Sequence, residues 1–253
     1  MVDIIIRARD GHELTAACIA SIRATTPAEI YRLVLVQDGS ASPYGGPESD
    51  VRMGYWPGRG AVTATNVGLA YCLGTDSEYV CILDNDTRIP DGDSGWLERF
   101  VAALEEGGPR CGCVGATTGF ANPPQHILAA PATYTGEWKD GQRAGGKENP
   151  DSVWFISFAC LLRKAAIFDC GLWDHRFDPG NWEDTDYSVQ LRTKGWSIKV
   201  AQSVYIHHEG HKTFSDGLRQ LLQTNGQKMA EKWGAGRLVD LGILSPQQLQ
   251  VQR

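Results

Sequence analysis

The chain of 253 residues contains 42% hydrophobic, 9% aromatic and 21% charged residues, a composition that is typical of a globular protein and excludes a disordered or fibrous chain. At this length the chain can bury a sizeable core without disulfides or a structural metal. Its formal net charge of −6, from 30 acidic and 24 basic residues, argues against broad electrostatic binding to DNA or to an anionic membrane.

The N-terminal residues, the hydropathy and the cysteines indicate a cytoplasmic protein. Asp3 stands where a signal peptide carries its basic region, and the apolar stretch 153–162 is about half of the roughly 20 residues that a spanning helix needs. Seven cysteines scattered through apolar segments predict reduced, buried thiols. Cys111 and Cys113 lack a second close pair, so we interpret them as strand packing rather than as a zinc site. Peripheral attachment to the inner membrane surface stays open.

The first elements along the chain predict a βαβ unit. Residues 4–8 form a short β-branched run, and the acidic sequence 10–13 that follows is a variant of the capping box, which predicts the start of a helix. Apolar residues recur every four positions from Leu14 to Ile22, as on a helix that packs against a sheet. A second strand is expected at residues 31–36, and two strands joined in this way by a helix are parallel.

The same alternation continues as far as residue 116. Residues 41–60 are rich in Gly, Pro and Ser, residues 61–73 have helical spacing, and residues 79–83 form the continuous apolar run of a buried strand. A further helix is expected over 96–104 and a strand over 113–116. The pattern predicts a parallel sheet with its ligand site beyond the carboxyl ends of the strands.

The second half of the chain is less regular. Polar residues rich in Gly and Pro fill 117–150 and predict a loop or a small hairpin. The remaining expected elements are the core run 153–162, helices over 163–168, 182–194 and 214–233, a strand over 197–206, and a frayed tail at 245–253. No linker separates two domains. We therefore expect one domain over 1–253, with a nucleotide-binding half at 1–116 and, at 117–253, an acceptor-binding half that ends in a helical tail.

Carboxylates gather at two element boundaries. Asp84 and Asp86 follow the buried strand and can point into one cleft, where carboxylate oxygens suit Mg²⁺ or Mn²⁺, although a solvated turn is the commoner explanation of a lone pair of this kind. Glu183, Asp184 and Asp186 lie at the start of a predicted helix, whose dipole favours acidic residues there. Crowding of carboxylates also raises the pKa of at least one of them, as a general base requires.

Two further segments carry polar groups with a chemical use. His207, His208 and His211 follow a predicted strand and offer imidazole ligands to a metal ion, and the sequence does not distinguish among the three. Residues 59–68 lead through glycine into a helix N-terminus that can face a phosphate. This segment lacks the Walker A lysine and the G-x-G-x-x-G spacing, which disfavours an ordinary nucleotidase or a dinucleotide site.

Taken in order, these segments resemble the family 2 glycosyltransferases of the GT-A fold. The resemblance implies an α/β, Rossmann-like three-layer sandwich with a central, mostly parallel sheet, and an inverting transfer of a single sugar from a nucleotide-sugar donor to an acceptor hydroxyl. The segments that carry it are residues 2–10, 36–40, 66–68, 82–86, 158–162, 181–186 and 207–210.

The resemblance assigns roles to individual residues. It implies that Asp84 and Asp86 hold a divalent metal, Mn²⁺ or Mg²⁺, on the donor diphosphate, with His207 as a further ligand. Asp184, beside Glu183, matches the general base of the inverting members. On the nucleotide side it implies that Ala8, Arg9, Asp10 and Asp38 bind the nucleoside and that Arg59, Asn66 and Gly68 line the nucleotide pocket.

The donor and the acceptor stay open at this point. The chain has Arg7 to Asp10 where members often have a Pro-Thr-Tyr-Asn-like run, and Gln37 where they often have Asp. The donor is UDP-, GDP- or dTDP-linked, and the acceptor is a glycan or another hydroxyl compound, with a nucleic acid the less favoured choice. The alternatives are a nucleotidyltransferase that makes a nucleotide sugar and a non-catalytic module that binds nucleotide sugars or glycans.

Overall fold

The computed structural model describes residues 1–55, 57–119, 125, 149–210 and 217–244. Most of the predicted loop 117–150, His211, the beginning of the predicted helix 214–233 and the predicted tail 245–253 lie outside the described residues.

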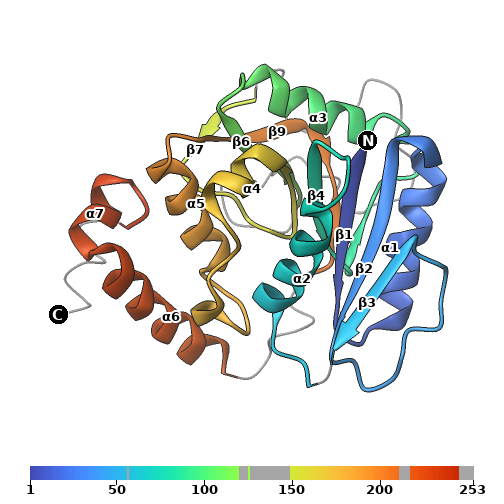
Figure 1. The fold of residues 1–253 in the computed structure, drawn as a ribbon, viewed down its shortest axis with the longest axis horizontal. Helices are drawn as coiled ribbons and strands as arrows, with labels where there is room; N and C mark the ends of the chain where they lie inside the picture. The colour runs from blue at the N-terminus through green and yellow to red at the C-terminus, as the bar shows by residue number, and fades with distance from the viewer. Residues whose placement is uncertain (56, 120–124, 126–148, 211–216, 245–253) are drawn as a thin grey trace.

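Eight strands in the described part of the chain form one sheet, in the order β3-β2-β1-β4-β8-β6-β9-β7 (Figure 1). They are β1 (Val2–Ala8), β2 (Tyr31–Asp38), β3 (Val51–Tyr55), β4 (Tyr79–Asp84), β6 (Cys111–Thr117), β7 (Asp151–Ser152), β8 (Ala159–Arg163) and β9 (Ser197–Tyr205). The four strands β3, β2, β1 and β4 are parallel, and so are β6 and β9. β8 runs antiparallel to both of its neighbours, and β7 runs antiparallel to β9 at the edge. The central sheet is therefore mostly parallel, as the resemblance implied.

Helices cover both faces of this sheet and complete three layers. They are α1 (His12–Thr25), α2 (Ala61–Leu73), α3 (Trp96–Glu106), α4 (Lys164–Cys170), α5 (Glu183–Thr193), α6 (Leu218–Trp233) and α7 (Ala235–Asp240), with the short 3₁₀ turns η1 (Ala28–Ile30) and η2 (His175–Phe177). One hydrophobic cluster joins α1 and α3 to the sheet, and a second joins α2, α4 and α5 to its other face. Figure 1 shows α6 and α7 at the end of the molecule remote from α1.

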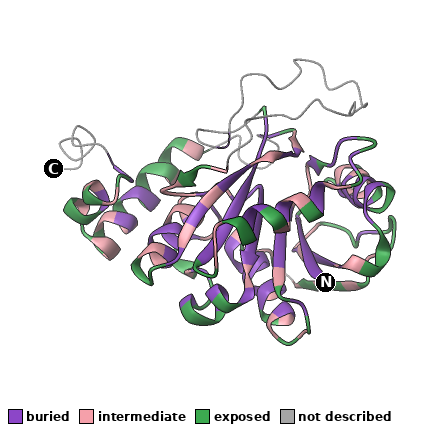
Figure 2. Cartoon of the chain, turned by 90° about the horizontal axis from the view of Figure 1, so that it is seen from above, coloured by how far each residue is buried: buried purple, intermediate pink, exposed green. Residues whose placement is uncertain are grey.

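Strand β1 shows why the core needs apolar residues on both faces of the sheet. Ile4 and Ile6 belong to the cluster on the α1 side, whereas Ile5 belongs to the cluster on the α2 side, because successive side chains of a strand point to opposite faces. All three are fully buried, and Figure 2 shows buried residues throughout the central strands. The continuous apolar runs that predicted buried strands are explained by this sandwiched position.

Several local predictions need correction. The capping box predicted at residues 10–13 does not form: α1 begins after Gly11, which has φ 57 and makes no side-chain cap, while Asp10 Oδ1 accepts a hydrogen bond from the amide of Ala41 at 2.8 Å. The segment 41–60, where no strand was predicted, contains β3. The strands of the first 116 residues are not all neighbours, because β8 separates β4 from β6.

Three smaller findings concern the site, the cysteines and the length of the helices. A second, two-stranded sheet pairs β5 (Thr87–Arg88) with β10 (His207–His208), and so brings the predicted histidines beside the end of β4. All seven cysteines are buried and free, as predicted. None of the described helices is long and apolar enough to span a lipid bilayer.

Candidate functional site

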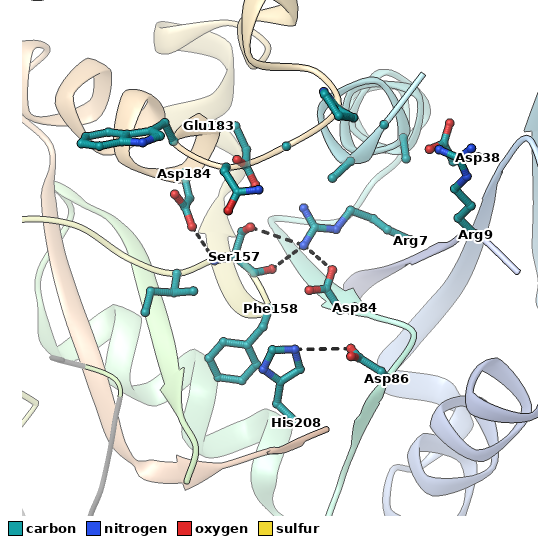
Figure 3. Close-up of a pocket in the computed structure, with 18 of the residues that line it drawn as sticks. Arg7, Arg9, Asp38, Asp84, Asp86, Ser157, Phe158, Glu183, Asp184 and His208 are labelled. Atoms are coloured by element: carbon teal, nitrogen blue, oxygen red, sulfur yellow. Dashed lines mark hydrogen bonds and ion pairs between the residues drawn. The ribbon is translucent and has the colours of Figure 1, made fainter. Parts of the chain in front are cut away.

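A cavity of about 1060 Å³ opens at the carboxyl ends of β1, β2 and β4 (Figure 3). Parallel strands present their following loops at one edge of the sheet, so this is where the fold places a ligand. The cavity is lined by residues 7–11, Leu14, Asp38, Gly60, Ala61, Ala64, 84–86, 154–158, 179–185, His208, Leu218, Leu222, Ile243 and Leu244.

Asp84, Asp86 and His208 form a cluster that could hold a metal ion. Their ligand atoms all lie within 4.8 Å of one another, and His208 Nε2 lies 3.4 Å from Asp86 Oδ1. Asp84 ends the buried strand β4, and burial raises its pKa while the neighbouring Arg7 lowers it. Two carboxylates and an imidazole are a donor set that suits Mn²⁺.

The structure brings His208, rather than the predicted His207, into this cluster. In β10 His207 pairs with Arg88 and His208 with Thr87. Since adjacent residues of a strand point to opposite sides, only one of two consecutive histidines can face the carboxylates. The imidazole of His208 also stacks on Phe158.

Arg7 lies between the carboxylates of the two halves, and no role was predicted for it from the sequence. Its guanidinium forms an ion pair with Asp84 and donates a hydrogen bond to the Ser157 carbonyl oxygen at 2.8 Å (Figure 3). It also donates to Thr65 Oγ1 at 3.1 Å. A charged residue near the end of a buried strand is the signal that could have identified it, because a buried charge needs partners.

Glu183 and Asp184 begin α5 and face the same cavity. Asp184 Oδ2 accepts a hydrogen bond from the amide of Ser157 at 3.3 Å, and Oδ1 accepts one from the amide of Thr185 at 2.7 Å. Burial raises the pKa of Asp184, and burial together with the charge of Asp184 raises that of Glu183 to about 8. Within the described part of the chain, Glu183 Oε2 has no hydrogen-bond partner although the residue is only 7% exposed.

Asp186, the third carboxylate of this motif, faces away from the cavity. Its oxygens accept hydrogen bonds from Lys232 Nζ at 2.8 Å and from Trp233 Nε1 at 2.7 Å, both at the end of α6. Lys232 also pairs with Asp174 at 2.8 Å. This carboxylate therefore anchors α6 to α5.

The residues predicted to bind the nucleoside or to line the nucleotide pocket divide into two groups. Ala8, Arg9, Asp10 and Asp38 line the cavity. Arg59, Asn66 and Gly68 are not among the lining residues, although the amide of Arg59 donates to Asp38 Oδ1 at 2.6 Å.

Asn66 and Gly68 belong to the packing of α2. The Asn66 side chain donates to the carbonyl oxygen of Trp173 at 2.8 Å and accepts from its amide at 2.9 Å. A Cβ atom at Gly68 would come within 2.8 Å of the Ile5 side chain. Both residues therefore fit helix α2 against its neighbours rather than the cavity, because they face inward from the helix.

The family model described as Glycosyl transferase family 2 matches residues 3–172. A search of the curated proteins found no match. Among solved structures, the chain is similar to GalNAc-T7 with UDP, GalNAc and Mn²⁺, at a TM-score of 0.68 and 15% identity over 92% of this chain and 48% of that one.

Two further solved structures have the same fold. TarS residues 1–349 of S. aureus, in complex with UDP-GlcNAc, gives a TM-score of 0.60 at 14% identity over 90% of this chain and 66% of that one. The mannosyltransferase PcManGT of Pyrobaculum calidifontis, in complex with GDP-Man and Mn²⁺, gives 0.58 at 16% identity over 84% and 57%. The chain thus spans about half to two thirds of the length of these proteins. The likeness shows the GT-A fold, as predicted.

Proposed function

The chain belongs to glycosyl transferase family 2, and on that premise we propose that it transfers a single sugar from a nucleotide-sugar donor to an acceptor hydroxyl. One observation carries the proposal: the cluster of Asp84, Asp86 and His208 and the pair Glu183 and Asp184 line the same cavity. In this reading residues 1–253 are one domain, with the nucleotide on the side of 1–116 and the acceptor on the side of 117–253.

The metal and the donor are assigned to the end of β4. Asp84, Asp86 and His208 offer two carboxylate oxygens and one imidazole nitrogen, which fit Mn²⁺ or Mg²⁺. A divalent cation held there supplies positive charge that stabilises a diphosphate leaving group. The Mn²⁺ and the UDP- and GDP-linked ligands of the similar structures support this choice of cofactor and donor class.

Asp184 is assigned as the general base. The amides of Ser157 and Thr185 orient its carboxylate. In a single displacement the acceptor oxygen attacks the anomeric carbon, the bond from that carbon to the diphosphate oxygen breaks, and the acceptor proton passes to Asp184, which inverts the anomeric centre. Glu183, whose pKa is raised to about 8, keeps its proton at neutral pH and limits the pair to one negative charge.

A donor screen followed by product analysis tests the proposal. UDP-, GDP- and dTDP-sugars are added with Mn²⁺ and the melting temperature is measured, since a ligand that binds only the folded state raises it. The donor that stabilises the chain is then incubated with candidate glycan acceptors, and NMR reports the anomeric configuration of the product.

The variant Asp184→Asn separates binding from chemistry. We expect it to bind the donor as the wild type does and to lose at least about 100-fold in kcat, because general base catalysis contributes about 10² to 10⁴ in rate. Wild-type kcat in this variant would show that Asp184 is not the general base. Release of pyrophosphate would indicate a nucleotidyltransferase instead, and donor binding with neither transfer nor hydrolysis would indicate a binding module.

A further inference from the structure

Arg7 connects the two catalytic regions within the sheet itself. It lies on β1 directly beside Asp84 of β4 in the strand register. The residue is 6% exposed, and it forms an ion pair with Asp84. One end of the connection is therefore a carboxylate of the metal cluster.

The other end of the connection runs through Ser157. The nitrogen of Arg7 that pairs with Asp84 also donates to the Ser157 carbonyl oxygen at 2.8 Å and to Ser157 Oγ at 3.3 Å. The amide of Ser157 in turn donates to Asp184 Oδ2 at 3.3 Å. Figure 3 shows this chain of contacts, with the Arg7 guanidinium between Asp84 and Ser157 and with Asp184 beyond Ser157.

The plane of the guanidinium is fixed from a third side. The second terminal nitrogen of Arg7 donates to Thr65 Oγ1 at 3.1 Å, and that hydroxyl donates to the carbonyl oxygen of Ala61 at 2.8 Å in α2. A planar guanidinium that donates hydrogen bonds from two of its nitrogens positions its acceptors more rigidly than a lysine ammonium does.

This inference rests on the proposed function. We propose that Arg7 is a positioning residue, whose guanidinium holds Asp84 directly and Asp184 through Ser157, and thereby fixes the distance between the leaving-group side and the base side of the cavity. An in-line displacement depends on that distance, and a misplacement of about 1 Å can cost about 100-fold in rate.

The test compares Arg7→Met, Arg7→Lys and a matched control, Arg163→Met. Arg163 also pairs with an acid, Glu105, and with a backbone carbonyl, that of Cys111, but it lies opposite Tyr79 at the other end of β4. Each variant is assayed for Mn²⁺ affinity by calorimetry, for kcat and KM with the donor found above, and for the pH profile of kcat/KM.

For Arg7→Met we expect a fall in kcat of about 100-fold with Mn²⁺ affinity retained or tighter, since Asp84 loses a competing cation. The acid limb of the profile moves to higher pH, because the positive charge of Arg7 lowers the pKa of Asp184. Arg7→Lys keeps the positive charge but loses the planar guanidinium. We therefore expect its pH profile of kcat/KM to match that of the wild type, and its kcat to lie between those of Arg7→Met and the wild type. We expect Arg163→Met to keep the Mn²⁺ affinity, the kcat and the pH profile of the wild type.

The outcomes separate this inference from the proposed function. Wild-type kcat in Arg7→Met or in Arg7→Lys overturns the positioning role while leaving the glycosyltransferase intact. Parallel losses of Mn²⁺ affinity, kcat and folded protein in both variants also overturn it, since they indicate a structural role alone. A wild-type chain that transfers no sugar from any donor rejects the proposed function instead.

Discussion

The imidazole of His208 lies almost parallel to the ring of Phe158, with 4.9 Å between the ring centroids and 15° between the planes. This stacking sets the plane of the imidazole, and its Nε2 atom then lies 3.4 Å from Asp86 Oδ1. A metal ligand whose orientation is fixed by packing loses little freedom on binding. The stacking on Phe158 thus orients the histidine that we propose as a metal ligand.

His208→Ala is expected to weaken Mn²⁺ binding by at least about tenfold, whereas His207→Ala leaves it within about twofold, because of these two histidines it is His208 that joins the cluster with Asp84 and Asp86. Calorimetric titration of both variants with Mn²⁺ measures the difference, and the two adjacent histidines are a matched pair. A larger loss of Mn²⁺ affinity in His207→Ala than in His208→Ala would show that His207 is the metal ligand, as predicted from the sequence.

Glu183→Gln is expected to change how stability depends on pH. The folded-state pKa of Glu183 is raised from its ordinary 4.5 to about 8 by burial and by the charge of Asp184. Between these values the unfolded chain releases a proton that the folded chain keeps, so this group lowers the free energy of unfolding as pH rises from about 4.5 to about 8. Each unit of pKa difference corresponds to about 1.4 kcal/mol.

Urea denaturation at pH 5, 6, 7 and 8 measures this effect. The wild type loses stability over the range relative to Glu183→Gln, and the variant is the more stable of the two at pH 8. Equal slopes in the two proteins would show that Glu183 ionises normally in the folded state, and the assignment of a single negative charge to the pair would then be wrong.

The sequence predicted the order of strands and helices well, because each buried strand of the first half is a continuous apolar run. It missed β3, whose residues alternate between half-buried and exposed at the edge of the sheet. It also could not predict that β8 lies antiparallel between β4 and β6. Strand neighbours that are distant in the chain depend on packing of the whole sheet rather than on local pattern.

Part of the candidate site could also be predicted from the positions of the strands and helices. Asp84, Asp86 and Asp184 follow or begin well-defined elements, so their approach to one cavity follows from the topology. The choice between His207 and His208 depends on the register of a two-residue strand, and a shift of one residue reverses which side chain faces the cluster. The contacts of Arg7 span 150 residues of sequence to Ser157, and no local pattern encodes them.

Asp186→Asn is expected to destabilise the fold without impairing the chemistry. The change removes the charge that pairs with Lys232 and weakens the bond from Trp233, at a cost of about 1 to 3 kcal/mol in the free energy of unfolding. The matched control is Asp169→Asn, whose more exposed carboxylate contacts Trp196 and Lys194 and should cost less. Urea denaturation gives both values.

The activity of the same variant decides its role. Donor hydrolysis per folded molecule should match the wild type, because Asp186 faces α6 and not the cavity. A fall in kcat of about 100-fold at unchanged stability would instead place Asp186 with the general base.

Gly68→Ala is expected to lower stability and to leave donor affinity unchanged. The new Cβ would lie within 2.8 Å of two carbon atoms of Ile5 in β1, and overpacking of this kind costs about 1 to 3 kcal/mol. Gly74→Ala, just after the same helix, is the control, since among the described residues its Cβ meets only the Tyr71 carbonyl oxygen at 3.4 Å. Urea denaturation and calorimetric donor titration separate the two properties. Weaker donor binding in Gly68→Ala at wild-type stability would mean that Gly68 contacts the nucleotide, as the sequence had predicted.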